Sequence, residues 1–162
     1  MRNHFVICIM SLLLGSCVSV QFPGGKSTSA KDVEFKAPAA PFKEITTSKA
    51  DKTWLSSQTG NTISFFSECG SSNDPSLAQI ENESLSALSN LEILKSEELT
   101  YNSRAAHQTI ARGKVDGIPV QISLLVFKKN GCNYTLSYGG VQVQFSSEEP
   151  TFEDFKRNFK AP

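Results

Sequence analysis

Apolar and polar residues alternate along much of the C-terminal part of the chain, and this period-two pattern predicts β-strands. Residues 118–127 are almost continuously apolar and predict a central strand, and residues 132–138 alternate as its partner. Asp116-Gly117 and Asn130-Gly131 precede these two segments and favour tight hairpin turns. This part of the chain therefore predicts an antiparallel meander.

Shorter runs predict the remaining strands. Residues 53–55 and 62–67 flank the turn sequence Thr59-Gly60-Asn61, which predicts another hairpin. Residues 92–102 and 104–115 predict two more strands, the second on a weak hydrophobic signal.

A first helix is predicted over residues 75–90. Asp74 can cap it, and Pro75 suits the first helical position. Its apolar residues gather on one broad side, which predicts that the helix packs on the sheet. These residues are Leu77, Ile80, Leu85, Leu88 and Leu91.

A second helix is predicted at the C-terminus, with Thr151 as its cap. Phe152, Phe155 and Phe159 recur there at helical spacing and predict a face that packs into the core. The alternative is an aromatic stripe that binds a membrane. Strands in hairpins together with two helices predict an α+β fold, an antiparallel sheet of about six strands packed by two helices.

The first residues have a different pattern. Residues 1–16 contain Arg2 in a polar start and then an apolar run, as in a signal peptide. The run is too short for a membrane-spanning helix, which needs about 20 residues. We therefore expect cleavage after Ser16.

The apolar run ends in Leu14-Gly15-Ser16-Cys17, which resembles the lipobox of bacterial lipoproteins. The resemblance implies export, a diacylglycerol on the Cys17 thiol and anchoring to a membrane of the cell envelope, with palmitate among the expected acyl chains. Val18 stands where an Asp often marks inner-membrane retention, so the resemblance favours the outer membrane and the periplasm. The alternative is an ordinary signal peptide with a chance cysteine.

Residues 17–50 are rich in Gly, Ser, Ala, Pro and Lys, and they predict a flexible tether behind the lipidated cysteine. Residues 51–162 then form a single domain. The alternative for the tether is a partner-binding tail with Phe35 and Phe42 as its anchors.

Cys69 and Cys132 are the two thiols that remain in the domain, and in an oxidising compartment they predict a disulfide. A metal or redox site is the rival interpretation, but neither cysteine has a CxxC neighbour. Two separate buried thiols stay open as a third possibility.

The charge balance and the sequence motifs give few indications of a chemical activity. Lys+Arg and Asp+Glu both number 16, so no basic surface for nucleic acid is indicated. The sequence contains no phosphate loop, metal-binding motif or Gly-x-Ser-x-Gly elbow, and we expect no cofactor and no metal. His107 is the sole imidazole of the domain, and the acidic pairs Glu97-Glu98 and Glu148-Glu149 are expected to be solvated.

The order of elements resembles the PsbP/Mog1-like group. The matching segments are Thr62-Ile63-Ser64-Phe65 with Glu68-Cys69-Gly70, residues 116–120, residues 128–134 and the helix at residues 152–159, so the similarity covers about residues 52–160. It implies the same fold and an accessory or binding role, but it carries over no partner-contacting residue.

The leading hypothesis is a membrane-anchored, non-enzymatic envelope lipoprotein that binds a protein partner. It predicts a solid core, an isolated His107 and a flat exposed aromatic patch. The alternatives are a hydrolase in which His107 meets a Ser and an Asp, and a carrier with a large dry pocket for an apolar ligand.

Overall fold

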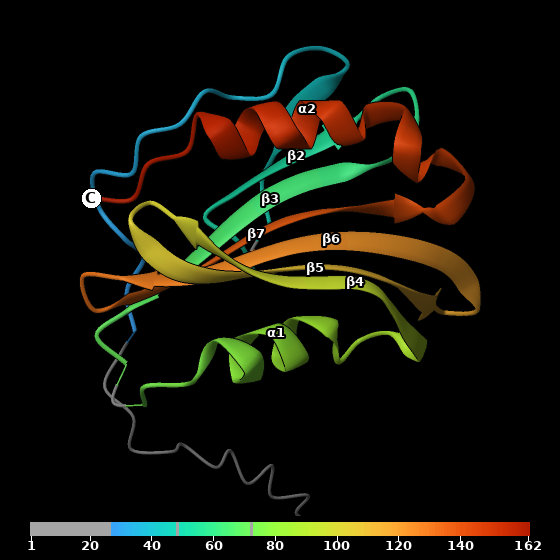
Figure 1. The fold of residues 1–162 in the computed structure, drawn as a ribbon. Helices are drawn as coiled ribbons and strands as arrows, with labels where there is room; N and C mark the ends of the chain where they lie inside the picture. The colour runs from blue at the N-terminus through green and yellow to red at the C-terminus, as the bar shows by residue number, and fades with distance from the viewer. Residues whose placement is uncertain (1–26, 48, 72) are drawn as a thin grey trace, which may run out of the picture.

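The computed structural model describes residues 27–162 apart from residues 48 and 72. A seven-stranded antiparallel sheet runs in the order β1-β2-β3-β7-β6-β5-β4. Helices α1 and α2 lie on opposite faces of it (Figure 1). The elements are β1 (Phe42–Ile45), β2 (Lys52–Ser56), β3 (Thr62–Cys69), α1 (Leu77–Leu85), β4 (Ser89–Tyr101), β5 (Arg104–Val115), β6 (Ile118–Lys129), β7 (Cys132–Val141), the 3₁₀ turn η1 (Gln142–Gln144) and α2 (Phe145–Arg157).

This architecture confirms the α+β prediction, with one strand more than the predicted six. Asp116, Gly117, Asn130 and Gly131 all have positive φ, as the tight β5–β6 and β6–β7 turns require. Helix α1 carries the chain from β3 across one face of the sheet to the edge strand β4. No helix in the described part of the chain is long and apolar enough to cross a membrane.

The main core lies between the sheet and α2 and is mostly aromatic. Alternation selects its members, because Ile63 and Phe65 of β3 point into it while Phe66 points to the α1 face. The three phenylalanines predicted to form the helical face are each at most 2% exposed, which confirms that they pack in the core. A smaller core on the other face joins α1 to the sheet through Leu85, Leu88, Ala111 and Leu124.

The described part of the predicted tether packs on the domain, so the prediction of a flexible tether is wrong for residues 28–47. Thr28 pairs with Cys69, Glu34 pairs with Lys160, and β1 is the additional strand beside β2. The sequence pattern failed here because isolated aromatic residues stand among small residues and prolines. The aromatic residues of this segment are held in place by contacts with distant parts of the chain.

Phe35 and Phe42 pack against their own domain, unlike the anchors of a partner-binding tail. The Phe35 ring lies 5.6 Å from Trp54 and 5.3 Å from Phe65, and Phe42 is buried. The predicted signal peptide, Cys17 and residues 18–26 lie outside the described residues.

The helix boundaries differ from those predicted. Ser76, not Asp74, caps α1, because its side chain accepts from the Gln79 amide while the Gln79 side chain accepts from the Ser76 amide. The helix ends at Leu85 rather than residue 90, since Ser89 already belongs to β4.

Helix α2 begins at Phe145, so Pro150 lies inside it and Thr151 is not its cap. The earlier start is explained by contacts that local sequence does not reveal. Phe145 is buried, and its ring lies tilted against that of Tyr138 of β7, with the ring centroids 4.8 Å apart.

Candidate functional site

Cys69 and Cys132 form a disulfide, as predicted. They are cross-strand partners at the same end of β3 and β7, with their Cα atoms 4.1 Å apart. Thr28 pairs with the backbone of Cys69, so the bond also fixes the strand end on which the N-terminal segment lies. This position makes the disulfide a structural bond.

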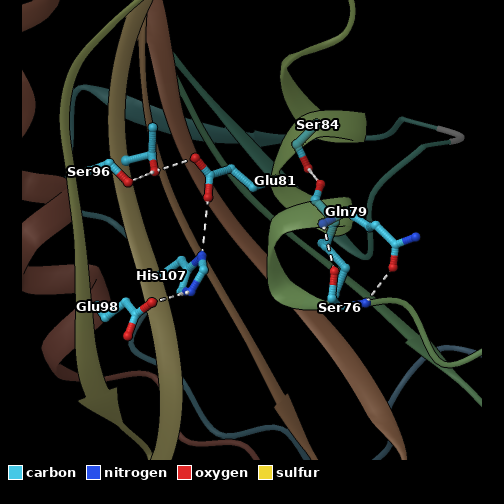
Figure 2. Close-up of polar contacts among 9 residues, drawn as sticks. Ser76, Gln79, Glu81, Ser84, Ser96, Glu98 and His107 are labelled. Carbon is cyan, nitrogen blue, oxygen red and sulfur yellow. Dashed lines mark hydrogen bonds and ion pairs between the residues drawn. The ribbon is translucent and has the colours of Figure 1, made fainter.

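His107 of β5 lies between two carboxylates on the α1 face (Figure 2). Its Nδ1 is 3.4 Å from Glu81 Oε2 of α1, and its Nε2 is 3.5 Å from Glu98 Oε1 of β4. The other Glu81 oxygen accepts from the Thr109 hydroxyl at 2.7 Å. The cluster therefore joins α1 to two strands of the sheet.

His107 is consequently not isolated, and that expectation is wrong. The neighbours also differ from those of a hydrolase, because the Thr109 hydroxyl bonds to Glu81 and the Ser96 hydroxyl contacts that of Thr109, and neither contacts the imidazole. In the described part of the chain both imidazole nitrogens face carboxylates, and neither is hydrogen-bonded to a hydroxyl. Such a hydrogen bond is the signature of a base that activates a nucleophile.

The acidic pair at the start of α2 is not simply solvated, because Glu148 is buried. Its carboxylate accepts from the Ser56 hydroxyl at 2.7 Å, the Thr59 hydroxyl at 2.5 Å and the Asn61 amide at 3.1 Å. It also lies in the first turn of α2, where the helix dipole favours negative charge. Sequence reasoning missed this cluster because its partners are far away in the chain.

Glu97 and Glu98 point to opposite faces of β4, as the strand pattern predicts. Glu97 pairs with Lys95 at 2.9 Å, whereas Glu98 faces His107 on the α1 side. These adjacent acids therefore cannot act together on one bond.

Tyr138 extends the Glu148 cluster toward the core. Its hydroxyl accepts from the Asn61 amide at 2.9 Å and donates to the carbonyl of Phe145. Burial, aided by the negative charge of Glu148, raises the pKa of Tyr138 to about 12. Gly140 is required beside it, because a Cβ there would lie 1.8 Å from Asn61 Oδ1.

An open groove of about 670 Å³ lies between α1 and the β3–β7 half of the sheet, on the face that α2 does not cover. Its floor is formed by side chains of β3 and β7. One wall is formed by α1 together with Pro75 before it and Ser86 after it. We call it the α1 groove. Its lining residues are Lys49, Phe66, Glu68, Pro75, Ile80, Glu83, Ser84, Ser86, Asn133 and Thr135.

In the described part of the chain the exposed apolar surface is aliphatic apart from Phe66, so it does not form the expected aromatic patch. Most of the exposed large apolar residues lie at the β5–β6 turn, at the start of β4 and around the end of β7: Leu91, Ile93, Leu94, Val115, Ile118, Val141 and Val143. The α1 groove is open and its lining mixes polar and apolar residues, which is unlike the dry pocket expected of a carrier.

No metal site is evident in residues 27–162 outside the two gaps. No three His, Cys, Asp or Glu side chains there are grouped so that they could hold an ion. The His107 cluster is unsuitable because its two carboxylates lie on different nitrogens of the ring.

No protein-family profile and no curated protein sequence matches the chain. Solved structures do match. LpqN of Mycobacterium tuberculosis, described as involved in cell envelope biogenesis, has a TM-score of 0.67 and 12% identity over 85% of this chain and 91% of LpqN. The cyanobacterial PsbP protein CyanoP of Synechocystis sp. PCC 6803 has a TM-score of 0.56 and 14% identity over 92% of this chain and 99% of CyanoP. At these identities the likeness concerns the fold, and this chain has a PsbP-like fold.

Proposed function

We propose that this protein is a lipid-anchored lipoprotein of the bacterial cell envelope, in the outer membrane, whose PsbP-like domain binds another envelope component and catalyses no reaction. The lipobox at residues 14–17 supports the anchor. The similarity to LpqN, a protein of cell envelope biogenesis, supports the location.

The α1 groove is the observation that carries the binding role. It is open, it lies on the face opposite α2, and several of its polar side chains make no hydrogen bond or ion pair with other described residues. The alternative enzymatic centre at His107 has its imidazole between two carboxylates. The geometry therefore supports recognition better than catalysis.

Lipid anchoring is tested by labelling cells with an alkyne analogue of palmitate. The wild-type protein should take up the label and fractionate with the outer membrane, whereas Cys17→Ser should do neither. A Cys8→Ser variant is the matched control, because Cys8 leaves with the predicted signal peptide, and it should behave as wild type. An unlabelled wild-type protein would contradict the anchor.

Binding is tested with a photo-reactive residue placed at Glu83, on the α1 groove, or at Arg157, on α2. We expect a discrete adduct from position 83 and none from position 157, where the side chain is 68% exposed on the opposite face. Adducts from both positions, or from neither, would contradict binding at the groove. A hydrolytic activity that disappears in His107→Ala would favour the enzyme instead.

A further inference from the structure

The α1 groove has an aromatic floor. Phe66 of β3 is 44% exposed, and it is the one aromatic residue among the exposed large apolar side chains of the described chain. It lies opposite Thr135 of β7, and Glu68 lies opposite Asn133 in the next pair on the same face. The floor is thus a flat ring surrounded by a hydroxyl, a carboxylate and an amide.

The polar groups around this ring are not engaged. The side chains of Glu68, Glu83, Asn133 and Thr135 make no hydrogen bond or ion pair with any other residue that the structure describes. By contrast, the hydroxyls of Ser84 and Ser86 are satisfied by backbone carbonyls of α1. The free groups are donors and acceptors that can serve a ligand.

Charge and polarity narrow the chemistry of that ligand. The groove contains two carboxylates, Glu68 and Glu83, and one cation, Lys49, so an anionic ligand is disfavoured. An acyl chain is disfavoured as well, because the apolar lining is limited to Phe66, Pro75 and Ile80. A neutral, hydroxyl-rich molecule fits both conditions.

We propose that the α1 groove binds a neutral oligosaccharide. A sugar ring has a flat face of C–H groups, which can stack on the Phe66 ring, and hydroxyls at its edge, which can bond to Glu68, Glu83 and Asn133. This inference rests on the proposed function and names the class of its ligand, a glycan chain of the envelope.

Calorimetric titration of the full acylated protein with chitohexaose tests the proposal. The protein is held in a zwitterionic detergent, because a sugar-based detergent would compete for the groove. We expect saturable binding by the wild type. Phe66→Ala should weaken it by about tenfold or more, as removal of a central aromatic contact does, while Phe66→Tyr should keep it.

Asn133→Ala is a second variant that alters the edge contacts and leaves the ring in place, and it should also weaken binding. Val143→Ala, at a valine that is 84% exposed and lies outside the groove lining, is the control and should bind as wild type. Thermal unfolding shows that each variant is folded. Co-sedimentation with purified peptidoglycan sacculi, with and without chitohexaose as competitor, distinguishes wall glycan from a free sugar.

Two results would overturn the inference: no saturable binding by the wild type, or equal binding by Phe66→Ala and wild type. Preferential binding of tetralysine would do the same, since it would assign Glu68 and Glu83 to a cationic segment. If the glycan fails while the adduct from position 83 persists, the proposed function stands and the ligand class is wrong. If neither glycan binding nor the adduct from position 83 is observed, the proposed binding function and the ligand class are both wrong.

Discussion

At the residue scale, the buried carboxylate of Glu148 connects parts of the chain that are far apart in sequence. Its donors come from the end of β2 and from the β2–β3 turn, while Glu148 itself lies in α2. A buried carboxylate is tolerated only when hydrogen bonds replace its hydration. Here three donors do so, and they also hold α2 against the turn.

Glu148→Gln is therefore expected to destabilise the domain by about 1–3 kcal/mol. The amide has one acceptor oxygen and brings an NH₂ group toward donors, so the Ser56, Thr59 and Asn61 groups cannot all be satisfied. Urea unfolding measures the change. Glu149→Gln, the adjacent acid outside this cluster, is the matched control and should shift stability by less than about 0.5 kcal/mol. An equal loss in both variants would rule out the network as the cause.

No local sequence feature identifies Glu148 as a buried residue. Residues can be predicted from sequence when they are rare in the chain, but not when only the fold gives them their partners. Cys69 and Cys132 were found because few thiols remain in the domain and the inferred compartment is oxidising. His107 was singled out because it is the sole imidazole of the domain. Nothing in the sequence distinguishes Glu81 and Glu98 from other surface carboxylates, because only the fold places them beside His107. The α1 groove has no sequence signal, since Phe66 follows a buried Phe65 and differs from it only in the face it occupies.

At the element scale, the strands that are joined by turns with a characteristic local sequence were predicted well. The segment at 104–115 coincides with β5, and the Asp-Gly and Asn-Gly turns are where their chemistry predicts. The start of α1 was missed although its capping box of Ser76 and Gln79 is local, whereas the start of α2 and the presence of β1 depend on contacts with distant residues. Phe145 begins α2 against Tyr138, and β1 exists because Phe42 packs into the core.

The disulfide acts at this scale by joining the ends of β3 and β7. It closes a loop of 63 residues, and replacing both cysteines with Ala should lower the free energy of unfolding by about 4 kcal/mol in the chain-entropy model. Chemical denaturation of the double variant measures this. Reductant should lower the stability of wild type to a similar extent and leave the double variant unchanged. A reductant effect on the double variant would indicate another cause.

At the scale of the whole molecule, buried tyrosines make stability sensitive to high pH. Burial raises the pKa of Tyr138 to about 12 and raises that of Tyr101 further, whereas a tyrosine in the unfolded chain ionises near pH 10. Above about pH 10 the unfolded state alone loses these protons and is favoured. The stabilising contribution is thus complete below pH 10 and is lost progressively toward pH 12.

We therefore expect the urea midpoint to fall steeply between pH 10 and pH 12. Tyr138→Phe should be less stable at pH 8, because it loses the bonds to Asn61 and Phe145, but its stability should decline less over the alkaline range. Lysine ionisation is common to both proteins, so the comparison isolates the tyrosine. Parallel declines in the two proteins would show that ionisation of Tyr138 does not contribute.

The folded domain also includes residues that precede β2. The composition of residues 17–50 predicts a tether, yet Phe35 and Phe42 pack in the core beneath α2 and β1 pairs with β2 at the edge of the sheet. Burying a phenylalanine contributes about 1.5–3 kcal/mol, which is a large share of a domain stability of about 5–15 kcal/mol. A chain that begins at Asp51 should therefore unfold at a much lower temperature than one that begins at Ser27.

Phe35→Ala in the longer chain separates the aromatic contact from the loss of the strand. It removes the ring that lies against Trp54, Phe65 and Phe155, and it should cost about 3 kcal/mol, at the low end for a core phenylalanine because Phe35 is only partly buried. Lys31→Ala, an exposed substitution in the same segment, should change little. If the chain beginning at Asp51 were as stable as the longer one, residues 27–50 would be an appendage after all, and the tether would reach to the start of β2.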